Sequence, residues 1–149
     1  MKTKSTKSKT QEIVINACYG GFSLSYEGVM LYAKLAGFKL YAFTNAMDKE
    51  GHLDFSHFVP YDGGTKEWMV HYSKKPLNTD GTYVDNAYFS DRDIPRDDKN
   101  LITTVKQLGE KANGSCAKLK VIEIPAGVKW EIEEYDGNEH VSESHERWS

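Results

Sequence analysis

Aromatic rings and guanidinium groups gather in one short stretch of the sequence, residues 88–96, Tyr-Phe-Ser-Asp-Arg-Asp-Ile-Pro-Arg. Tyr88 and Phe89 offer flat faces on which a nucleobase can stack. Arg92 and Arg96 offer planar forks, each of which can hold a phosphate through two hydrogen bonds. The stretch therefore indicates a site for a nucleotide-type ligand. A second interpretation stays open, in which nearby carboxylates pair with both arginines in an ion network before a helix; these are Asp91, Asp93, Asp97 and Asp98.

A second candidate is the glycine corner at residues 18–23, Cys-Tyr-Gly-Gly-Phe-Ser, where Tyr19, Gly20 and Gly21 are candidate ligand contacts. A strand that turns through two glycines into a helix exposes backbone N–H groups at the positive end of the helix dipole, which suits a phosphate. The lysine and the spacing of a phosphate-binding loop are missing. A tight turn that requires positive φ is therefore the favoured interpretation of this corner.

Asp136, His140 and His145 form a third candidate in the acidic C-terminal segment. A carboxylate with two histidines can bind a metal or act as an acid–base pair, which would suit a metal-assisted nucleotide hydrolase. The two histidines are five residues apart, however, and not the four that align ligands on one helix face. A polar tail is the favoured interpretation. The chain shows no serine elbow and no zinc-protease motif, so its sequence signals no enzyme and no cofactor.

Strands and helices on either side must position these residues. Residues 13–18 form a β-branched run that predicts a buried strand. Apolar residues at helical spacing predict a helix from Tyr26 to a stop at Gly37 and a second helix that starts at Asp97 or Asp98. Further strands are expected at residues 38–43, 68–72, 118–124 and 128–135. The last two alternate between apolar and polar residues on either side of a Pro-Ala-Gly turn. This pattern predicts a β-hairpin with one solvent-exposed, charged face.

The fold class that follows is α+β: one domain, residues 12–149, with a mixed or antiparallel sheet of about five strands and two main helices on one face. Residues 1–11 are rich in lysine and are expected to be a disordered basic tail. Exposed hairpins and spare aromatic residues favour a homo-oligomer.

Composition narrows the function classes. The chain has 149 residues, a net charge of −3 and 39% hydrophobic residues, which suits one globular domain. No apolar run is long enough for a membrane helix, and no signal peptide is recognisable, so a cytoplasmic protein is expected. The two cysteines are too few for a disulfide framework. The acidic balance argues against a nucleic-acid partner, and an anionic ligand would need a local basic pocket.

Three motifs occur together: Asn-Ala-Cys-Tyr-Gly-Gly-Phe at 16–22, Asp-Arg-Asp-Ile-Pro-Arg-Asp-Asp at 91–98 and Glu-Ile-Glu-Glu-Tyr-Asp-Gly at 131–137. With them the chain resembles a family of small proteins encoded by tailed bacteriophages. The resemblance implies a phage origin and the cytoplasm of the infected bacterium, and it transfers no catalytic residues. We expect a phage accessory protein that binds, without cleaving, a small nucleotide-type immune signal of the host. The alternatives are an inhibitor that binds a host protein and the metal-assisted nucleotide hydrolase.

Overall fold

The computed structural model describes residues 9–63 and 69–144. In chain order its elements are β1 (Thr10–Asn16), α1 (Tyr26–Ala36), β2 (Tyr41–Met47), β3 (Leu53–Pro60), β4 (His71–Ser73), β5 (Tyr88–Phe89), the 3-10 turn η3 (Asp91–Asp93), α2 (Lys99–Leu108), the 3-10 turn η4 (Gly109–Ala112), β6 (Leu119–Pro125), β7 (Trp130–Tyr135) and β8 (Asn138–Glu143). The predicted α+β class is confirmed. Among the described residues, no helix combines the length and the apolar character that crossing a bilayer requires.

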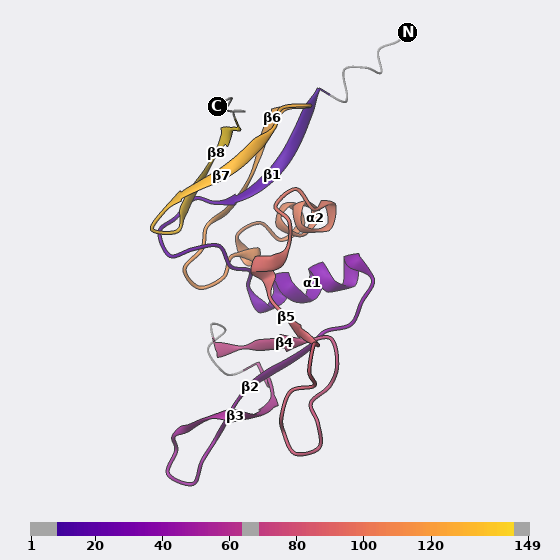
Figure 1. Cartoon of the computed structure of the whole chain (residues 1–149), viewed down its shortest axis with the longest axis vertical. Helices are drawn as coiled ribbons and strands as arrows, with labels where there is room; N and C mark the ends of the chain where they lie inside the picture. Colours follow the sequence, from indigo (N-terminus) through magenta and orange to yellow (C-terminus); the bar gives the residue numbers. More distant parts are fainter. Residues whose placement is uncertain (1–8, 64–68, 145–149) are drawn as a thin grey trace, which may run out of the picture.

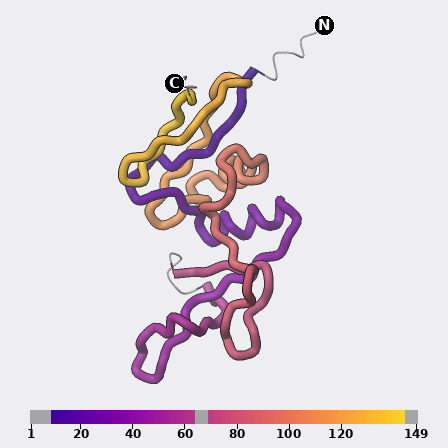
Figure 2. The backbone as a smooth tube through the Cα atoms, viewed as in Figure 1, coloured from indigo at the N-terminus to yellow at the C-terminus, as the bar shows by residue number. Residues whose placement is uncertain are grey.

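The two helices lie between two β layers (Figure 1). On one side is a four-stranded antiparallel sheet with the order β3-β2-β4-β5. On the other side are two antiparallel pairs, β1 with β6 and β7 with β8. The chain trace shows how β1 and β6, far apart in sequence, run side by side (Figure 2), with Thr10 opposite Pro125 and Asn16 opposite Leu119.

Helix ends follow their capping residues. Ser25 caps α1 by accepting a hydrogen bond from the N–H of Gly28, and Gly37 ends that helix at a φ of 87°. Asp98 caps α2 and accepts from the N–H groups of Asn100 and Leu101. The apolar faces of both helices meet one core, which includes Val14, Phe22, Leu24, Val29, Tyr32, Leu40, Ile94, Leu101 and Val105. This core holds the strand ends and loops that surround the candidate site.

Several expected features of the sheets differ in the structure. No sheet among the described residues has five strands, and the helices lie between β layers and not on one face of a single sheet. The predicted hairpin of β6 with β7 is wrong, because β6 pairs with β1 and β7 pairs with β8. Alternation of apolar and polar residues indicates that one face of a strand is buried. The alternation is the same whichever strand is the hydrogen-bonded partner, so it does not identify that partner. Side-chain bonds from Gln11 to the carbonyls of Pro125 and Val128 hold the connection between the two pairs.

The limits of the predicted tails also change. Residues 10 and 11, expected in a disordered tail, belong to β1, while residues 1–8 lie outside the described residues. The segment after Asp136, expected as a polar tail, contributes strand β8. Trp68, which begins one of the expected strands, also lies outside the described residues; the neighbouring strand β4 begins at His71.

Candidate ligand-binding pocket

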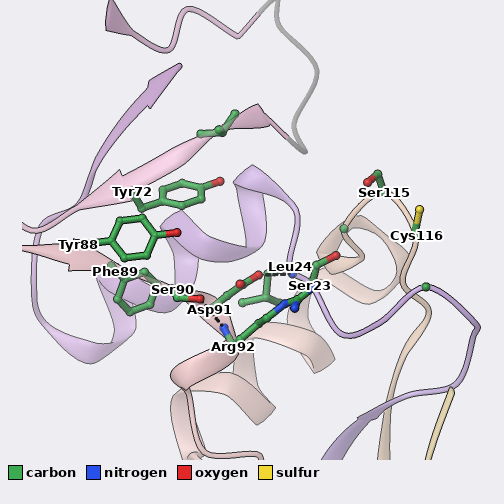
Figure 3. Close-up of a pocket in the computed structure, with 13 residues that line it drawn as sticks. Ser23, Leu24, Tyr72, Tyr88, Phe89, Ser90, Asp91, Arg92, Ser115 and Cys116 are labelled. Carbon is green, nitrogen blue, oxygen red and sulfur yellow. Dashed lines mark hydrogen bonds between the residues drawn. The ribbon is translucent and has the colours of Figure 1, made fainter. Parts of the chain in front are cut away.

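A cavity of about 280 Å³ lies where segments that are distant in sequence meet (Figure 3). We call it the Arg92 cavity. The loop before α1, the strand pair β4–β5, the η3 turn and the loop after η4 each supply part of its wall. The wall residues include Gly20, Ser23, Leu24, Tyr72, Tyr88, Phe89, Ser90, Asp91, Arg92, Ser115 and Cys116.

The short strand β5 places the aromatic residues of this wall. It pairs with β4, with Phe89 opposite Tyr72, so consecutive side chains point to opposite sides of the sheet. Phe89 packs into the core against the rings of Tyr32 and Phe38, at centroid distances of 6.2 Å and 5.8 Å. Tyr88 is 60% exposed. Phe89 therefore anchors the strand, whereas Tyr88 lines the cavity and lies 6.0 Å from the ring of Tyr83 in a T-shaped arrangement.

Arg92 is the cation of the cavity. Ser90 caps the η3 turn by accepting a hydrogen bond of 3.2 Å from the N–H of Arg92, which fixes the backbone of the turn at this residue. The guanidinium extends along the wall toward Ser23 (Figure 3) and lies close to the backbone of Gly21. Within residues 9–63 and 69–144, no carboxylate forms an ion pair with it. This guanidinium is therefore available to an anion.

Asp91 supplies a carboxylate to the same wall. It is half-buried, and its Oδ2 atom accepts a hydrogen bond of 2.8 Å from the N–H of Leu24. Burial raises the pKa of Asp91, while the Leu24 bond and the charge of Arg92 act in the opposite direction. A carboxylate and a guanidinium that are adjacent in the chain thus share one cavity without pairing with each other.

Arg96 lies outside the cavity, which corrects its assignment as a ligand contact. Both of its terminal nitrogens bind the carboxylate of Glu139, and its guanidinium lies 3.9 Å from the centroid of the Phe22 ring. The two charged side chains are only 17% and 7% exposed. The partner of Arg96 is thus a glutamate 43 residues later and none of the neighbouring aspartates. Arg96 holds the fold together and has no free face for a ligand.

Of the three candidate ligand contacts in the glycine corner, Tyr19, Gly20 and Gly21, only Gly20 lines the cavity. Gly20 and Gly21 have φ values of 121° and 98°, and the N–H of Gly20 donates to the carbonyl of Asp136. A Cβ atom at Gly20 would lie 2.7 Å from the Cβ of Cys116. These contacts describe a tight turn that no larger residue fits. Tyr19 points elsewhere, with its ring 6.4 Å from that of Tyr135.

Three backbone donors at the start of α1 are already in use, which argues against the idea that they await a phosphate. The N–H of Leu24 donates to Asp91 and that of Ser25 to the carbonyl of Ala112. The N–H of Gly28, in the first turn of the helix, donates to the side chain of Ser25. The Arg92 side chain is therefore the charged donor that these described wall residues offer to an anion.

The third predicted cluster is not assembled in the described residues. Asp136 occupies a two-residue turn with a φ of 50°, and its neighbour Gly137 has a φ of 87°, as a tight hairpin requires. His140 lies opposite Glu133, with its Nε2 atom 3.1 Å from Oε1 of that exposed glutamate. His145 lies outside the described residues. A different trio, Asp48, Glu50 and His52, brings three potential metal ligands within 4.8 Å of one another, but all three are exposed on a turn.

Sequence reasoning missed several members of the site. Asp91 was considered only as a partner for the arginines, and Tyr72, Ser115 and Cys116 carried no signal because each reaches the wall from a distant segment. Together the wall offers one cation, one carboxylate, several hydroxyl groups and an exposed ring. This set can hold a ligand by stacking, hydrogen bonds and charge. No family model, no curated protein and no solved structure matches this chain.

Proposed function

We propose that this protein binds a small nucleotide-type ligand in the Arg92 cavity and releases it unchanged. The observation that carries the proposal is the guanidinium of Arg92, which lines a cavity beside the exposed ring of Tyr88 and has no carboxylate partner among the described residues. A guanidinium binds a phosphate through two parallel hydrogen bonds, and a tyrosine face stacks on a nucleobase.

The size of the cavity supports a compact ligand. Its 280 Å³ lies just under the roughly 300–1,000 Å³ that is typical of small-molecule pockets. That volume suits one base with its sugar and phosphate. A larger ligand, such as a cyclic dinucleotide, would leave one half outside this cavity.

The chemistry of the wall favours binding over hydrolysis. Among the described wall residues the only carboxylate is that of Asp91, and its Oδ2 atom already accepts the N–H of Leu24. The described wall contains no histidine that could serve with it as a general base or a metal ligand. The groups present are those that fix the position of a ligand.

The biological setting of the proposal comes from the phage-like motifs. A phage protein that captures a nucleotide immune signal in the infected bacterial cytoplasm would lower the free concentration of that signal. The chain is acidic overall, with a net charge of −3, so capture of an anion requires a local cation, and Arg92 supplies one.

Titration calorimetry tests the binding proposal. We expect at least one of AMP, GMP, CMP and UMP to bind saturably at protein concentrations above micromolar, and chromatography to recover it intact. Arg92→Ala removes a charged hydrogen-bond donor worth about 1.5–3 kcal/mol, so affinity should fall roughly tenfold to a hundredfold. Lys34→Ala, which removes one positive charge from the exposed end of α1, should bind like the wild type. No heat with any nucleotide, or full affinity in Arg92→Ala, contradicts the proposal.

A second candidate function, binding to a host protein or to another copy of this chain, is favoured by a separate surface. Met47 and Phe55, on the hairpin formed by β2 and β3, are 65% and 79% exposed. Both side chains belong to one hairpin, and a contiguous apolar patch on a surface is typical of an interaction site. The double variant Met47→Ser, Phe55→Ser should lose a specific bacterial partner in pull-down or an oligomer in sedimentation, with nucleotide binding unchanged. If neither changes, this surface has no such role.

A further inference from the structure

We propose that the Arg92 cavity selects guanine, with Asp91 accepting hydrogen bonds from the N–H groups on the Watson–Crick edge of the base while Arg92 holds a phosphate. This proposal rests on the proposed function, because it names the class of nucleotide that the same cavity takes. It starts from the presence of Asp91 and Arg92, an acceptor and a donor, on one wall.

The carboxylate of Asp91 has hydrogen-bonding capacity that the protein leaves unused. Among the described residues, its Oδ2 atom accepts a 2.8 Å bond from the N–H of Leu24, and the backbone N–H groups of Asp91 itself and of Arg92 also interact with the carboxylate. An ionised carboxylate has about four acceptor positions on its two oxygens. A half-buried carboxylate with open positions is satisfied best by a ligand that brings N–H donors.

Guanine is the base whose edge matches such an acceptor. Its N1–H and its N2 amino group are neighbouring donors, so both can point at one carboxylate. Adenine and cytosine place a ring nitrogen with a lone pair beside their amino group, and that lone pair would face the negative oxygens. Uracil has a single N–H between two carbonyl acceptors. Sites built to hydrogen-bond a particular group reject analogues that lack it, because buried polar groups then stay unpaired.

The remaining wall groups agree with this orientation. The rings of Tyr72 and Tyr88 lie near Asp91 with their hydroxyl ends on the same side (Figure 3), so a base could lie beside them. The guanidinium of Arg92 extends away from the sheet toward Ser23, on the side where a phosphate attached to that ring would lie. One ligand can thus contact the carboxylate with its base and the guanidinium with its phosphate.

Calorimetry with GMP, IMP and AMP tests the selection. IMP has the N1–H of guanine without its amino group, so its affinity should lie between those of the other two, and GMP should bind at least tenfold more tightly than AMP. Asp91→Asn keeps an oxygen that can accept the N–H of Leu24, so the fold should persist, while the GMP-to-AMP ratio should fall close to one. Asp93→Asn is the matched control, because Asp93 is exposed on the same η3 turn. The GMP-to-AMP affinity ratio of this variant should not change.

Arg92→Ala separates this proposal from the proposed function. It should weaken GMP and AMP alike and preserve their ratio, since it removes the phosphate contact only. Equal affinities of GMP and AMP for the wild type, or an unchanged ratio in Asp91→Asn, overturn guanine selection and leave nucleotide binding standing. Absence of binding by every nucleotide overturns both.

Discussion

The carboxylate of Glu139 binds both terminal nitrogens of Arg96, with Oε2 lying 2.9 Å from Nη2. Oε1 of the same carboxylate accepts the N–H of Asn16 at 2.9 Å, and the Arg96 carbonyl accepts the N–H of Val14. Glu139 therefore joins β8 to β1 and to the segment that leads from η3 into α2. Because η3, which carries Asp91 and Arg92, directly precedes this segment, the buried ion pair fixes one end of the chain that forms the cavity wall.

Removal of Glu139 should destabilise the protein strongly. Glu139→Ala leaves the guanidinium of Arg96 and the N–H of Asn16 buried without partners, which costs about 3–5 kcal/mol. Lys106→Ala breaks the more exposed pair with Glu12 and should cost about 0–1 kcal/mol. Urea unfolding of both variants measures the difference. Equal losses of stability would show that the Arg96–Glu139 pair does not hold the fold as described.

Gly137 should tolerate no side chain. At its φ of 87°, a Cβ atom would overlap the backbone N of Gly21 and lie 2.7 Å from the Cα of that residue. Gly127 has nearly the same φ, 84°, with open space around it. Gly127→Ala should therefore lose about 1–2 kcal/mol from backbone strain alone. Gly137→Ala should lose a further amount of about 1–3 kcal/mol from the overlap. Thermal unfolding at matched pH compares the two, and equal losses would contradict the close contact between the glycine corner and the β7–β8 turn.

Tyr88 should contribute to nucleotide affinity through its ring. Tyr88→Ala removes a stacking partner worth about 1–3 kcal/mol, and Tyr88→Phe should keep most of that affinity. Tyr19 is equally exposed, at 60%, but its ring lies against Tyr135 outside the cavity, so Tyr19→Ala should bind normally. Calorimetry with the nucleotide that binds most tightly measures the affinity of all three variants. A loss in Tyr19→Ala as large as that in Tyr88→Ala would place the ligand elsewhere.

Binding of guanine should depend on pH through Asp91. The ionised carboxylate accepts the N–H donors, so affinity is present above the pKa of Asp91 and declines as the pH falls through it. Burial raises that pKa above the ordinary value of an aspartate, so the decline should begin at a higher pH than an exposed aspartate would give. The probe of choice is 3′,5′-cyclic GMP, because its phosphodiester stays ionised throughout. In Asp91→Asn the affinity for cyclic GMP should no longer fall at low pH. If the affinity of this variant still declines, another group is responsible for the titration.

Local sequence signals predicted the elements that depend on local chemistry. The predicted start of α1 at Tyr26 and its predicted end at Gly37 are both correct. Asp98, one of the two predicted caps of α2, is the residue that caps it. These succeed because caps and helical spacing act within a few residues. The pairing of β6 with β1 could not be deduced in this way, since each strand carries the same alternation with either partner.

The residues of the candidate site also fall into two groups: those that a local sequence motif can reveal and those whose environment is set by the tertiary fold. Tyr88, Phe89 and Arg92 line the cavity and occupy one continuous segment, which a motif can reveal. Arg96 belongs to the same motif, but its environment is set by Glu139 on β8, which only the tertiary fold brings near. Asp91 was judged by its neighbours in sequence, whereas its role follows from Leu24, 67 residues earlier.

The most direct test of the account is to locate a bound nucleotide on the protein. Amide ¹⁵N–¹H spectra recorded during titration with GMP report which backbone groups change environment. We expect saturable shifts at Leu24, at Ser90 to Arg92 and at Ser115 and Cys116, the segments that form the Arg92 cavity. Unchanged spectra at a saturating excess of GMP, or shifts confined to the β2–β3 hairpin, would contradict it.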